Sequence, residues 1–243
     1  MDDEIFGIHA VYEALESGGR LIDRIYVSKE SGVPKLRSIQ TLARERGISV
    51  RHETRAALDR LARGNLHQGV IAIAGVVAYA PLEELIKTPN ALLVVLDEIQ
   101  DPQNLGAVIR SAEVSGASGL IVTDRRTAPL SSAVGRASAG AVDHLPIARV
   151  SNLVGAIKAI KEAGIWVVGV DPAATCRWTE FDFTSPVALV LGAEHKGIRR
   201  LVREGCDALV GFPTLGRIES LNLSVAAGIA LYEVVRQRRS WET

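Results

Sequence analysis

Three small polar residues stand two positions apart near the C-terminal end of the sequence. Ser220, Asn222 and Ser224 follow a loop that contains Pro213 and Gly216, and an apolar, alanine-rich stretch begins directly after them. Side chains of Ser and Asn accept hydrogen bonds from the free backbone N–H groups of a helix start, so helix capping is one interpretation. The other interpretation is that these groups bind a ligand beside the helix. This stretch alone leaves both open.

A second polar group follows the apolar run at residues 91–96. Asn104, Gly106 and Arg110 lie along a predicted helix, and Arg110 falls just beside its apolar stripe. Because helical side chains lean toward the N-terminus and Gly106 offers no obstruction, we expect Arg110 to reach over the helix start beside Asn104. The alternative is a surface arginine on a helix that Asn104 caps.

A third loop follows the apolar run at residues 187–191. It contains Gly192, Glu194 and Gly197, and it lacks both the GK[ST] ending of a phosphate-binding P-loop and a GxGxxG pattern. Its glycines favour a close approach of backbone to a ligand, although an ordinary turn uses glycine for the same conformational reason. We therefore treat this loop as a candidate binding loop.

The elements that carry these loops have the pattern of an α/β fold. Several apolar runs lack polar alternation, as is typical of parallel strands that are covered on both faces. These runs are residues 91–96, 120–123, 165–170 and 187–191. Helical periodicity lies between them, at residues 104–115, 131–139 and 152–163. The alternation predicts a doubly wound parallel sheet, whose ligands bind beyond the carboxyl ends of the strands, so the three loops should meet there.

The N-terminal third predicts a separate, smaller α/β domain. Proline-marked polar sequence at residues 78–90 divides it from the rest, so we expect a small domain at 1–77, a linker at 78–90 and a large domain at 91–243. Periodicity in the small domain predicts helices at 9–17, 34–46 and 54–63 and strands at 24–28, 48–51 and 69–77.

Composition is that of an ordinary globular protein. Hydrophobic residues make up 47% of the 243 and charged residues 23%, which excludes a disordered chain. The 28 basic and 28 acidic residues cancel, but residues 34–64 contain eight Lys or Arg against three acidic residues. This excess fits a solvated helical surface or a phosphate-binding patch. The basic residues are Lys35, Arg37, Arg44, Arg46, Arg51, Arg55, Arg60 and Arg63.

The cysteines and the N-terminus indicate a cytoplasmic protein. Cys176 and Cys206 are isolated, which argues against a disulfide scaffold or a zinc site and fits a reducing compartment. The acidic start lacks the pattern of a signal peptide, and no apolar run is long enough to cross a membrane. We expect no membrane association.

Taken in order, the three loops resemble the three motifs of the SpoU class of SPOUT methyltransferases. The resemblance rests on Asn104-x-Gly106-x-x-x-Arg110, on L-G-A-E-x-x-G at 191–197 and on the stretch 212–224. The segments 7–11 (G-I-H-A-V) and 67–69 (H-Q-G) resemble the small substrate-binding domain of the same family. The sequence departs from the family pattern at four positions, with Phe212 where Ile is usual, Thr214 where Met is frequent, and His195 and Lys196 in a turn that is commonly richer in glycine.

The resemblance implies a fold, a reaction and partners. It implies a parallel sheet with a deep C-terminal trefoil knot, S-adenosylmethionine as methyl donor without a metal, and an RNA substrate whose ribose 2′-oxygen is methylated. The sequence most resembles the bacterial enzymes of the family that methylate a guanosine in 23S ribosomal RNA. The resemblance also implies a dimer through the knot region, for which the apolar face of residues 223–235 is a candidate surface, unless it belongs to the core. Transfer RNA as substrate and a non-catalytic RNA-binding protein remain alternatives, and the missing GxGxxG makes an oxidoreductase improbable.

The resemblance also assigns site residues. Arg110 is the implied catalytic residue, either as a base or, since guanidinium normally stays protonated, as a clamp on an RNA phosphate that stabilises the developing alkoxide. The five histidines lack paired metal spacing and are expected to be structural or surface residues, with His9 and His67 the better candidates for the alternative role of RNA contact. The residues implied to orient Arg110 and the ribose are Asn104, Glu194, Ser220 and Asn222. The residues implied to contact the cofactor are Leu191, Gly192, Gly197, Phe212, Leu221 and Ser224.

Overall fold

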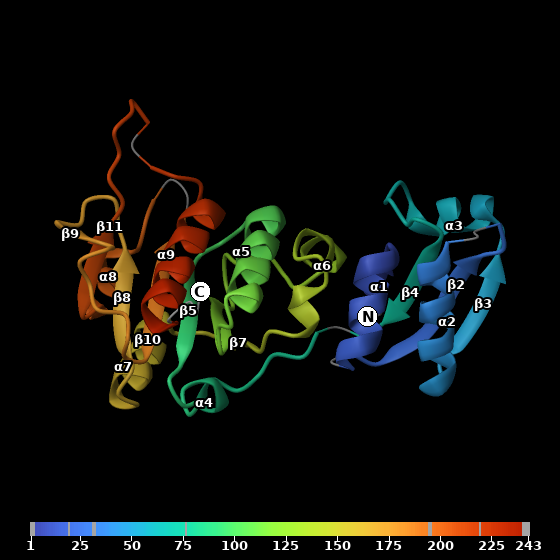
Figure 1. Ribbon diagram of the computed structural model, residues 1–243, viewed down its shortest axis with the longest axis horizontal. Helices are drawn as coiled ribbons and strands as arrows, with labels where there is room; N and C mark the ends of the chain where they lie inside the picture. The colour runs from blue at the N-terminus through green and yellow to red at the C-terminus, as the bar shows by residue number, and fades with distance from the viewer. Residues whose placement is uncertain are drawn as a thin grey trace. The chain divides into compact units, whose positions relative to one another are not determined.

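The chain forms two compact units in a computed structural model that describes residues 3–18, 20–30, 33–75, 77–193, 196–218 and 220–239 (Figure 1). The N-terminal unit comprises Met1–Ala78 together with Pro129–His144. The C-terminal unit comprises Tyr79–Ala128 and Leu145–Thr243. Each unit has its own sheet.

The N-terminal unit is a four-stranded sheet with helices on both faces. Its strand order is β1-β4-β2-β3, in which β4 runs antiparallel to both neighbours and β2 runs parallel to β3. Helices α1 (Ile8–Ser17) and α2 (Pro34–Glu45) bury apolar residues on one face, and α3 (Arg55–Ala62) does so on the other. The strands are β1 (Asp3–Phe6), β2 (Ile22–Ser28), β3 (Ser49–Glu53) and β4 (Val70–Ala74).

A segment from the middle of the chain packs into this unit. Helix α6 (Ser132–Ala137) contacts β1, and the 3-10 helix η1 (Ala141–Asp143) contacts α1. A buried ion pair joins Arg20 to Asp143. From the sequence we expected this segment to belong to the larger domain, with the rest of residues 91–243. Periodicity predicts local helices and strands, but it does not show against which unit an element packs.

The C-terminal unit contains a parallel sheet of seven strands, which confirms the predicted sheet type. Its order is β7-β6-β5-β10-β8-β11-β9, and every neighbouring pair is parallel. All six residues of β5 are buried, as its unbroken apolar sequence predicts. The strands are β5 (Leu92–Asp97), β6 (Gly119–Thr123), β7 (Ile147–Val150), β8 (Trp166–Val170), β9 (Cys176–Arg177), β10 (Val187–Gly192) and β11 (Ala208–Gly211).

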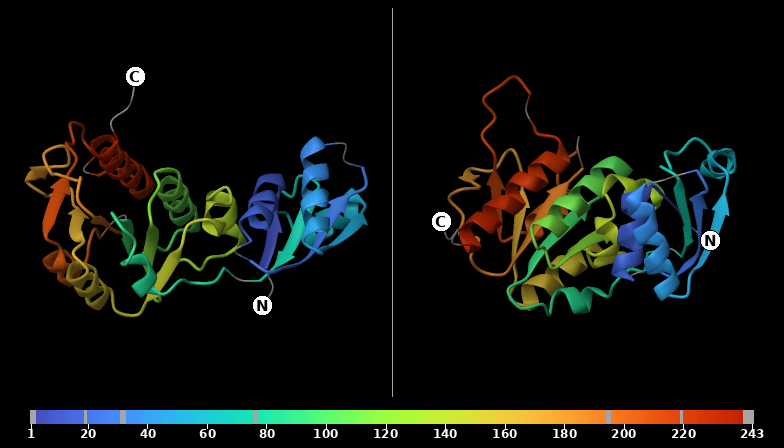
Figure 2. Two further views of the ribbon diagram at one scale, coloured as in Figure 1. Left: turned by 60° about the horizontal axis from the view of Figure 1, so that its bottom comes forward. Right: turned by 45° about the vertical axis from the view of Figure 1, so that its right-hand side comes forward.

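Helices cover both faces of this sheet. Figure 2 shows α5 (Pro102–Val114) and α9 (Leu223–Arg238) side by side on one face, with α7 (Leu153–Glu162) and α8 (Arg200–Gly205) on the other. The short helix α4 (Leu82–Leu85) adds Leu85 to the core on the side of α7. None of the described helices is long and apolar enough to cross a membrane.

Periodicity failed where elements are short. It did not predict β1, β7, β9 or α8, which have between two and six residues each. The predicted helix at residues 104–115 also begins two residues later than α5. The helix begins at Pro102, directly after its N-cap residue Asp101. The loops at the carboxyl ends of β5, β10 and β11 nevertheless fall where the sequence predicted them.

Candidate functional site

A pair of side-chain amides joins the starts of α5 and α9. The Asn222 Nδ2 group donates to Asn104 Oδ1 at 3.1 Å, and the Asn104 Nδ2 group donates to Asp101 Oδ2 at 3.1 Å. Asn104 is only 9% exposed, so its amide needs such partners. The bonds fix the two amides against each other although 118 residues separate them in sequence.

Asn222 has a second role as the N-cap of α9. Its Oδ1 atom accepts the backbone N–H of Ser224 at 2.9 Å and that of Val225 at 3.4 Å. The Ser224 hydroxyl donates to the same atom at 2.6 Å. Capping and a contact across the site therefore coexist in one side chain. The capping interpretation of Asn104 is wrong, because Asp101 caps α5 by accepting the Gln103 N–H at 2.9 Å.

A buried carboxylate ties the end of β5 to the start of α8. The Asp97 side chain is 0% exposed and accepts the Arg199 backbone N–H at 2.9 Å and its Nε–H at 2.7 Å. Arg199 also pairs with Glu98 at 3.1 Å. Sequence reasoning missed both Asp97 and Arg199. The available signal was an acidic residue at the end of an otherwise apolar strand, where burial of a charge requires a partner.

The loop between β10 and Arg199 needs its two glycines for its own path. A Cβ atom on Gly192 would lie 2.0 Å from the carbonyl carbon of Gly197. Gly197 has φ of +62° and donates its N–H to the Ala193 carbonyl at 2.9 Å. From the sequence we expected these glycines to let the backbone approach a ligand. In the structure, the atoms closest to Gly192 are backbone atoms of Gly197 and Ile198 in the same loop. Glu194 lies outside the described residues.

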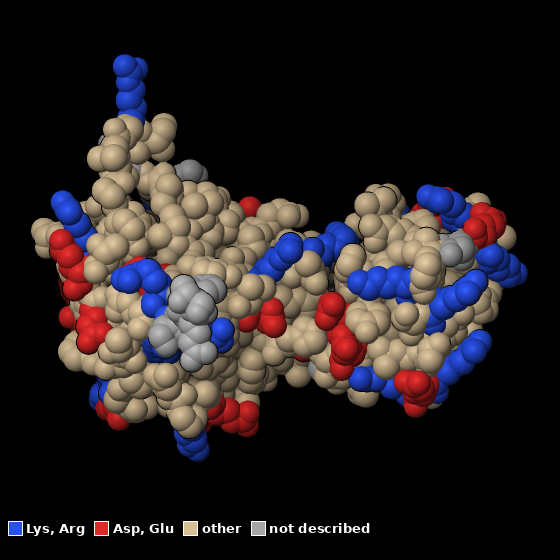
Figure 3. Space-filling view, in the orientation of Figure 1, with Lys and Arg blue, Asp and Glu red and all other residues tan. Residues whose placement is uncertain are grey.

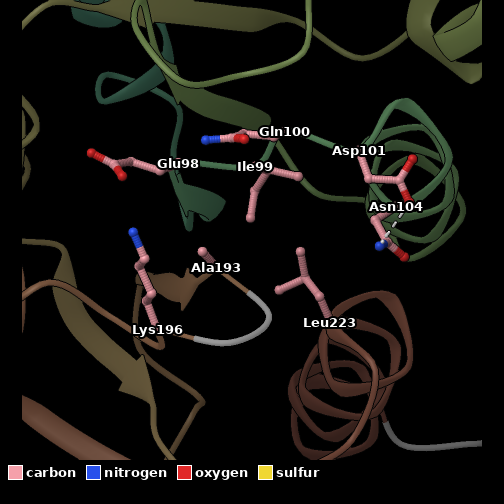
Figure 4. Close-up of a pocket in the computed structure, with 8 residues that line it drawn as sticks. All are labelled: Glu98, Ile99, Gln100, Asp101, Asn104, Ala193, Lys196 and Leu223. Carbon is pink, nitrogen blue, oxygen red and sulfur yellow. Dashed lines mark hydrogen bonds between the residues drawn. The ribbon is translucent and has the colours of Figure 1, made fainter.

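Two adjoining cavities open among these loops. We call them the Gly192 cavity, of about 440 Å³, and the Glu98 cavity, of about 280 Å³. They share Ala193, Lys196 and Leu223 as lining residues. Among the residues implied by the resemblance, the Gly192 cavity is lined by Leu191, Gly192, Gly197, Phe212, Ser220 and Leu221. Figure 4 shows the Glu98 cavity, which is lined by Glu98, Ile99, Gln100, Asp101 and Asn104 besides the shared residues.

The Gly192 cavity combines apolar walls with one charged pair. The Phe212 ring meets the Trp178 ring edge-on at 5.3 Å between centroids. Asp171 and Arg203 form an ion pair at 2.9 Å, and both line the cavity. Sequence reasoning did not select either of these charged residues. The volume and the mixed lining are those of a site for a small molecule with a flat apolar part and polar groups.

Three implied site residues, Arg110, Asn222 and Ser224, are not among the lining residues of either cavity. Arg110 is exposed on α5 and has no hydrogen bond or ion pair with any residue that the structure describes. Ser224 does not line the Gly192 cavity, since its hydroxyl turns to Asn222. No group of three or more His, Cys, Asp or Glu residues that could hold a metal ion occurs within the described ranges.

Sequence comparison relates both parts of the chain to known families. The SpoU rRNA Methylase family matches residues 91–232, and the family described as RNA 2'-O ribose methyltransferase substrate binding matches residues 5–80. The chain is 39% identical over 241 residues to a putative TrmH family tRNA/rRNA methyltransferase, YacO, from Bacillus subtilis, covering 97% of this chain and 96% of the relative. It is also 39% identical over 242 residues to the 23S rRNA (guanosine-2'-O-)-methyltransferase RlmB of Photobacterium profundum, covering 98% and 99% respectively.

Structural comparison agrees with the sequence matches. An AdoMet-bound rRNA methyltransferase from Sinorhizobium meliloti superposes with a TM-score of 0.85 at 31% identity, over 98% of this chain and 88% of that one. The family match spans the sheet, the three loops and the amide pair between α5 and α9. The chain therefore belongs to the SpoU rRNA methylase family.

Proposed function

We propose that the protein transfers a methyl group from S-adenosylmethionine to the ribose 2′-oxygen of a guanosine in 23S ribosomal RNA. The observation that carries the proposal is the position of the amide pair. Asn104 lines the Glu98 cavity, and the residues on both sides of Asn222 line the Gly192 cavity. Two cavities that share Leu223 as a lining residue, directly after Asn222 of the amide pair, suit a donor and an acceptor that react with each other. Relatives named 23S rRNA (guanosine-2'-O-)-methyltransferase, aligned over nearly the whole chain, support the choice of RNA.

The Gly192 cavity fits the cofactor. Its apolar walls at Leu191, Phe212 and Leu221 suit an adenine ring, and loop backbone at Gly192 supplies hydrogen-bonding groups. When bound, S-adenosylmethionine supplies a methyl group that is already activated on a sulfonium. The residues of the chain then have two tasks, to align the ribose hydroxyl and to stabilise the negative charge that develops on its oxygen.

Arg110 is the proposed catalytic residue. Its guanidinium is proposed to hold the RNA backbone and to stabilise the developing alkoxide by donating hydrogen bonds. Its exposure and its lack of a partner within the described part of the chain leave it available for this contact. Asn104 and Asn222 orient the ribose, and Ser220 and Glu194 are proposed to assist them.

The N-terminal unit is proposed to bind the RNA. Residues 34–64 carry the basic excess, and Figure 3 shows Lys and Arg side chains spread over the surface of this unit with fewer acidic ones among them. Cations spaced over a surface bind phosphates without reading sequence. The match of residues 5–80 to a substrate-binding family supports this assignment.

We further propose a trefoil knot and a homodimer. The insertion of β10 between β5 and β8, together with a long loop before α9 returns to pack on α5, supports the knot. Val225, Ile229 and Tyr232 are 37% to 49% exposed and recur on one face of α9, which supports a second copy as its partner. Sedimentation of the purified chain tests the dimer.

The function is tested by mapping methylation. A deletion strain should lack one 2′-O-methylguanosine in 23S rRNA, and the purified protein with S-adenosylmethionine should restore it. A missing mark in transfer RNA instead would move the proposal to that substrate, and no missing mark in either RNA would contradict it.

Arg110→Ala tests the mechanism. We expect kcat/KM to fall about 100-fold, the cost typical of a lost transition-state donor, with cofactor affinity unchanged. The control is Arg200→Ala, because Arg200 is exposed on α8 and pairs only with Glu204 among the described residues. Methylation by Arg110→Ala at the wild-type rate would exclude the proposed role.

A further inference from the structure

The Glu98 cavity has polar groups at both ends and an apolar middle. In Figure 4 the polar ends of Glu98, Gln100 and Lys196 gather at one end, and Asp101 and Asn104 lie at the other. The side chains of Ile99, Ala193 and Leu223 lie between these ends. Its volume of about 280 Å³ is near the lower limit of small-molecule sites, about 300 Å³. A flat ring with polar edges fits a cavity of this kind.

Glu98 is held rigidly in this cavity. Its backbone has φ of +65°, a conformation that residues other than glycine rarely adopt and that occurs often at functional sites. Its side chain is 11% exposed, and its carboxylate is bound by Arg199 at 3.1 Å and by Arg126 at 3.3 Å. Two cations hold the carboxylate in place. A carboxylate offers about four acceptor positions, so it can accept further N–H groups from a ligand.

Lys196 complements Glu98 at the same end of the cavity. Its ammonium has no ion pair or hydrogen bond with any residue in the described ranges. Figure 4 shows the side chain extending toward the end of the cavity where Glu98 lies. The cavity therefore offers an acceptor and a donor next to each other, and the donor is still available.

We infer that this end of the Glu98 cavity recognises the guanine base of the acceptor nucleotide, with Glu98 and Lys196 as the specificity-determining residues. This inference rests on the proposed function. Guanine carries two N–H donors, at N1 and N2, beside the acceptor O6, which matches a carboxylate next to an ammonium. Adenine has a donor where guanine has O6 and an acceptor at N1, so it opposes both groups.

The same orientation brings the ribose to the reaction. A guanosine with its base at Glu98 has its ring between Ile99 and Leu223, where apolar side chains replace the stacking lost when a base leaves its RNA strand. Its ribose then lies at the end formed by Asn104. That end adjoins the residues around Asn222 that line the Gly192 cavity.

Base analogues at the methylated position test the inference. The substrates are short RNAs with the mapped site, carrying guanosine, inosine or adenosine there, because inosine lacks only the N2 amino group of guanosine. We expect the wild-type protein to prefer guanosine to inosine by about 10- to 100-fold in kcat/KM, the discrimination typical of a paired contact to a base edge. Adenosine should be methylated more slowly still.

Glu98→Gln and Lys196→Met identify the groups responsible. Glu98→Gln should lower kcat/KM on guanosine and reduce the preference over inosine to less than about threefold, because the second acceptor is lost. Lys196→Met should reduce the preference for guanosine over adenosine. Matched controls are Glu162→Gln and Lys158→Met, whose side chains form an exposed pair on α7. Both controls should keep the wild-type preferences.

The outcomes separate the inference from the function beneath it. A variant that slows guanosine and inosine equally would assign Glu98 a structural role and overturn the inference, while the methyltransferase activity stands. A wild-type protein that methylates inosine as fast as guanosine would overturn it in the same way. A wild-type protein that methylates none of the RNAs would overturn the proposed function itself.

Discussion

Two regions of the molecule use glycine and polar residues at strand ends, yet in different ways. In the N-terminal unit, Gly7 and the turn 67–69 supply them, and in the C-terminal unit the loops after β5, β10 and β11 do. In both regions, we chose candidate functional residues from the sequence because glycines and polar residues stand together there. In the first region the polar groups bond within the unit, whereas in the second they stand beside cavities.

The N-terminal turn uses its side chains for its own structure. His67 is 5% exposed, and its Nδ1 atom accepts the Gly69 N–H at 3.0 Å while Nε2 lies 2.8 Å from Asp59 Oδ1. The Gln68 Oε1 atom accepts the Ile8 N–H at 3.0 Å and so closes the start of α1. The expected structural role of His67 is confirmed, because its ring is buried and both nitrogens are engaged, and its alternative role in RNA contact is not supported. His9 is exposed and lies 3.1 Å from the Lys35 ammonium, so it stays a candidate.

The difference shows what makes a polar turn functional. A turn residue acts on a ligand when its donors and acceptors face a cavity after the local hydrogen bonds are made. Asn104 meets that condition because it lines the Glu98 cavity while its amide is held by Asp101 and Asn222. His67 does not meet it. Residue types alone cannot distinguish these cases.

The largest effect should come from filling the space at the two glycines. Gly192→Ala forces a methyl group into the Gly197 backbone, 2.0 Å away, and should weaken cofactor binding about 100-fold or more, since overpacking costs about 1–3 kcal/mol even where side chains can move. Gly7→Ala is strained for another reason, the φ of +93° at this position, and it lies far in sequence from the cofactor loops. It should lower stability by about 1–3 kcal/mol and leave cofactor affinity unchanged. Calorimetric titration with S-adenosylmethionine and urea unfolding measure the two effects. Equal cofactor affinity in the wild type and in Gly192→Ala would contradict the proposed difference between the two glycines.

A smaller effect should separate the two roles of Asn222. Asn222→Ala removes the cap and the bond to Asn104, so stability should fall by about 0.5–2 kcal/mol and methylation should fall with it. Asn222→Ser restores a good cap but cannot reach Asn104 with an amide. We expect Asn222→Ser to recover the stability and not the methylation rate. Full activity of Asn222→Ser would mean that capping is the whole contribution of this side chain.

The smallest effect on activity should come from the buried histidine. His67→Ala leaves the buried Gly69 N–H without its acceptor and should lower the free energy of unfolding by about 1–3 kcal/mol. RNA affinity of the folded protein should stay within about twofold, since a buried ring has no access to RNA. The control His52→Ala changes an exposed residue of β3 and should alter stability by less than about 0.5 kcal/mol. A large loss of RNA affinity without a loss of stability would show that His67 contacts RNA and would contradict this prediction.

Much of the fold followed from local sequence. Unbroken apolar runs such as residues 91–96 and 187–191 predicted buried parallel strands, because a strand covered on both faces has no exposed positions for polar residues. The ends of these strands located the loops of the site. Short elements such as β9 and α8 escaped prediction, since two to six residues are too few to show a period.

The sequence by itself determined the parallel α/β architecture, the position of the three loops and the polar residues they carry. Only the tertiary structure decided which of these residues meet. The Asn104–Asn222 bond spans 118 residues and the Arg199–Asp97 pair spans 102, and a local pattern contains no information on contacts at such separations. Packing of α5 on α9 and of β10 on β5 brings them together because burying apolar faces fixes the helices and strands. Tertiary packing likewise buried His67 and left Arg110 exposed, although both belong to motifs of equal clarity in the sequence.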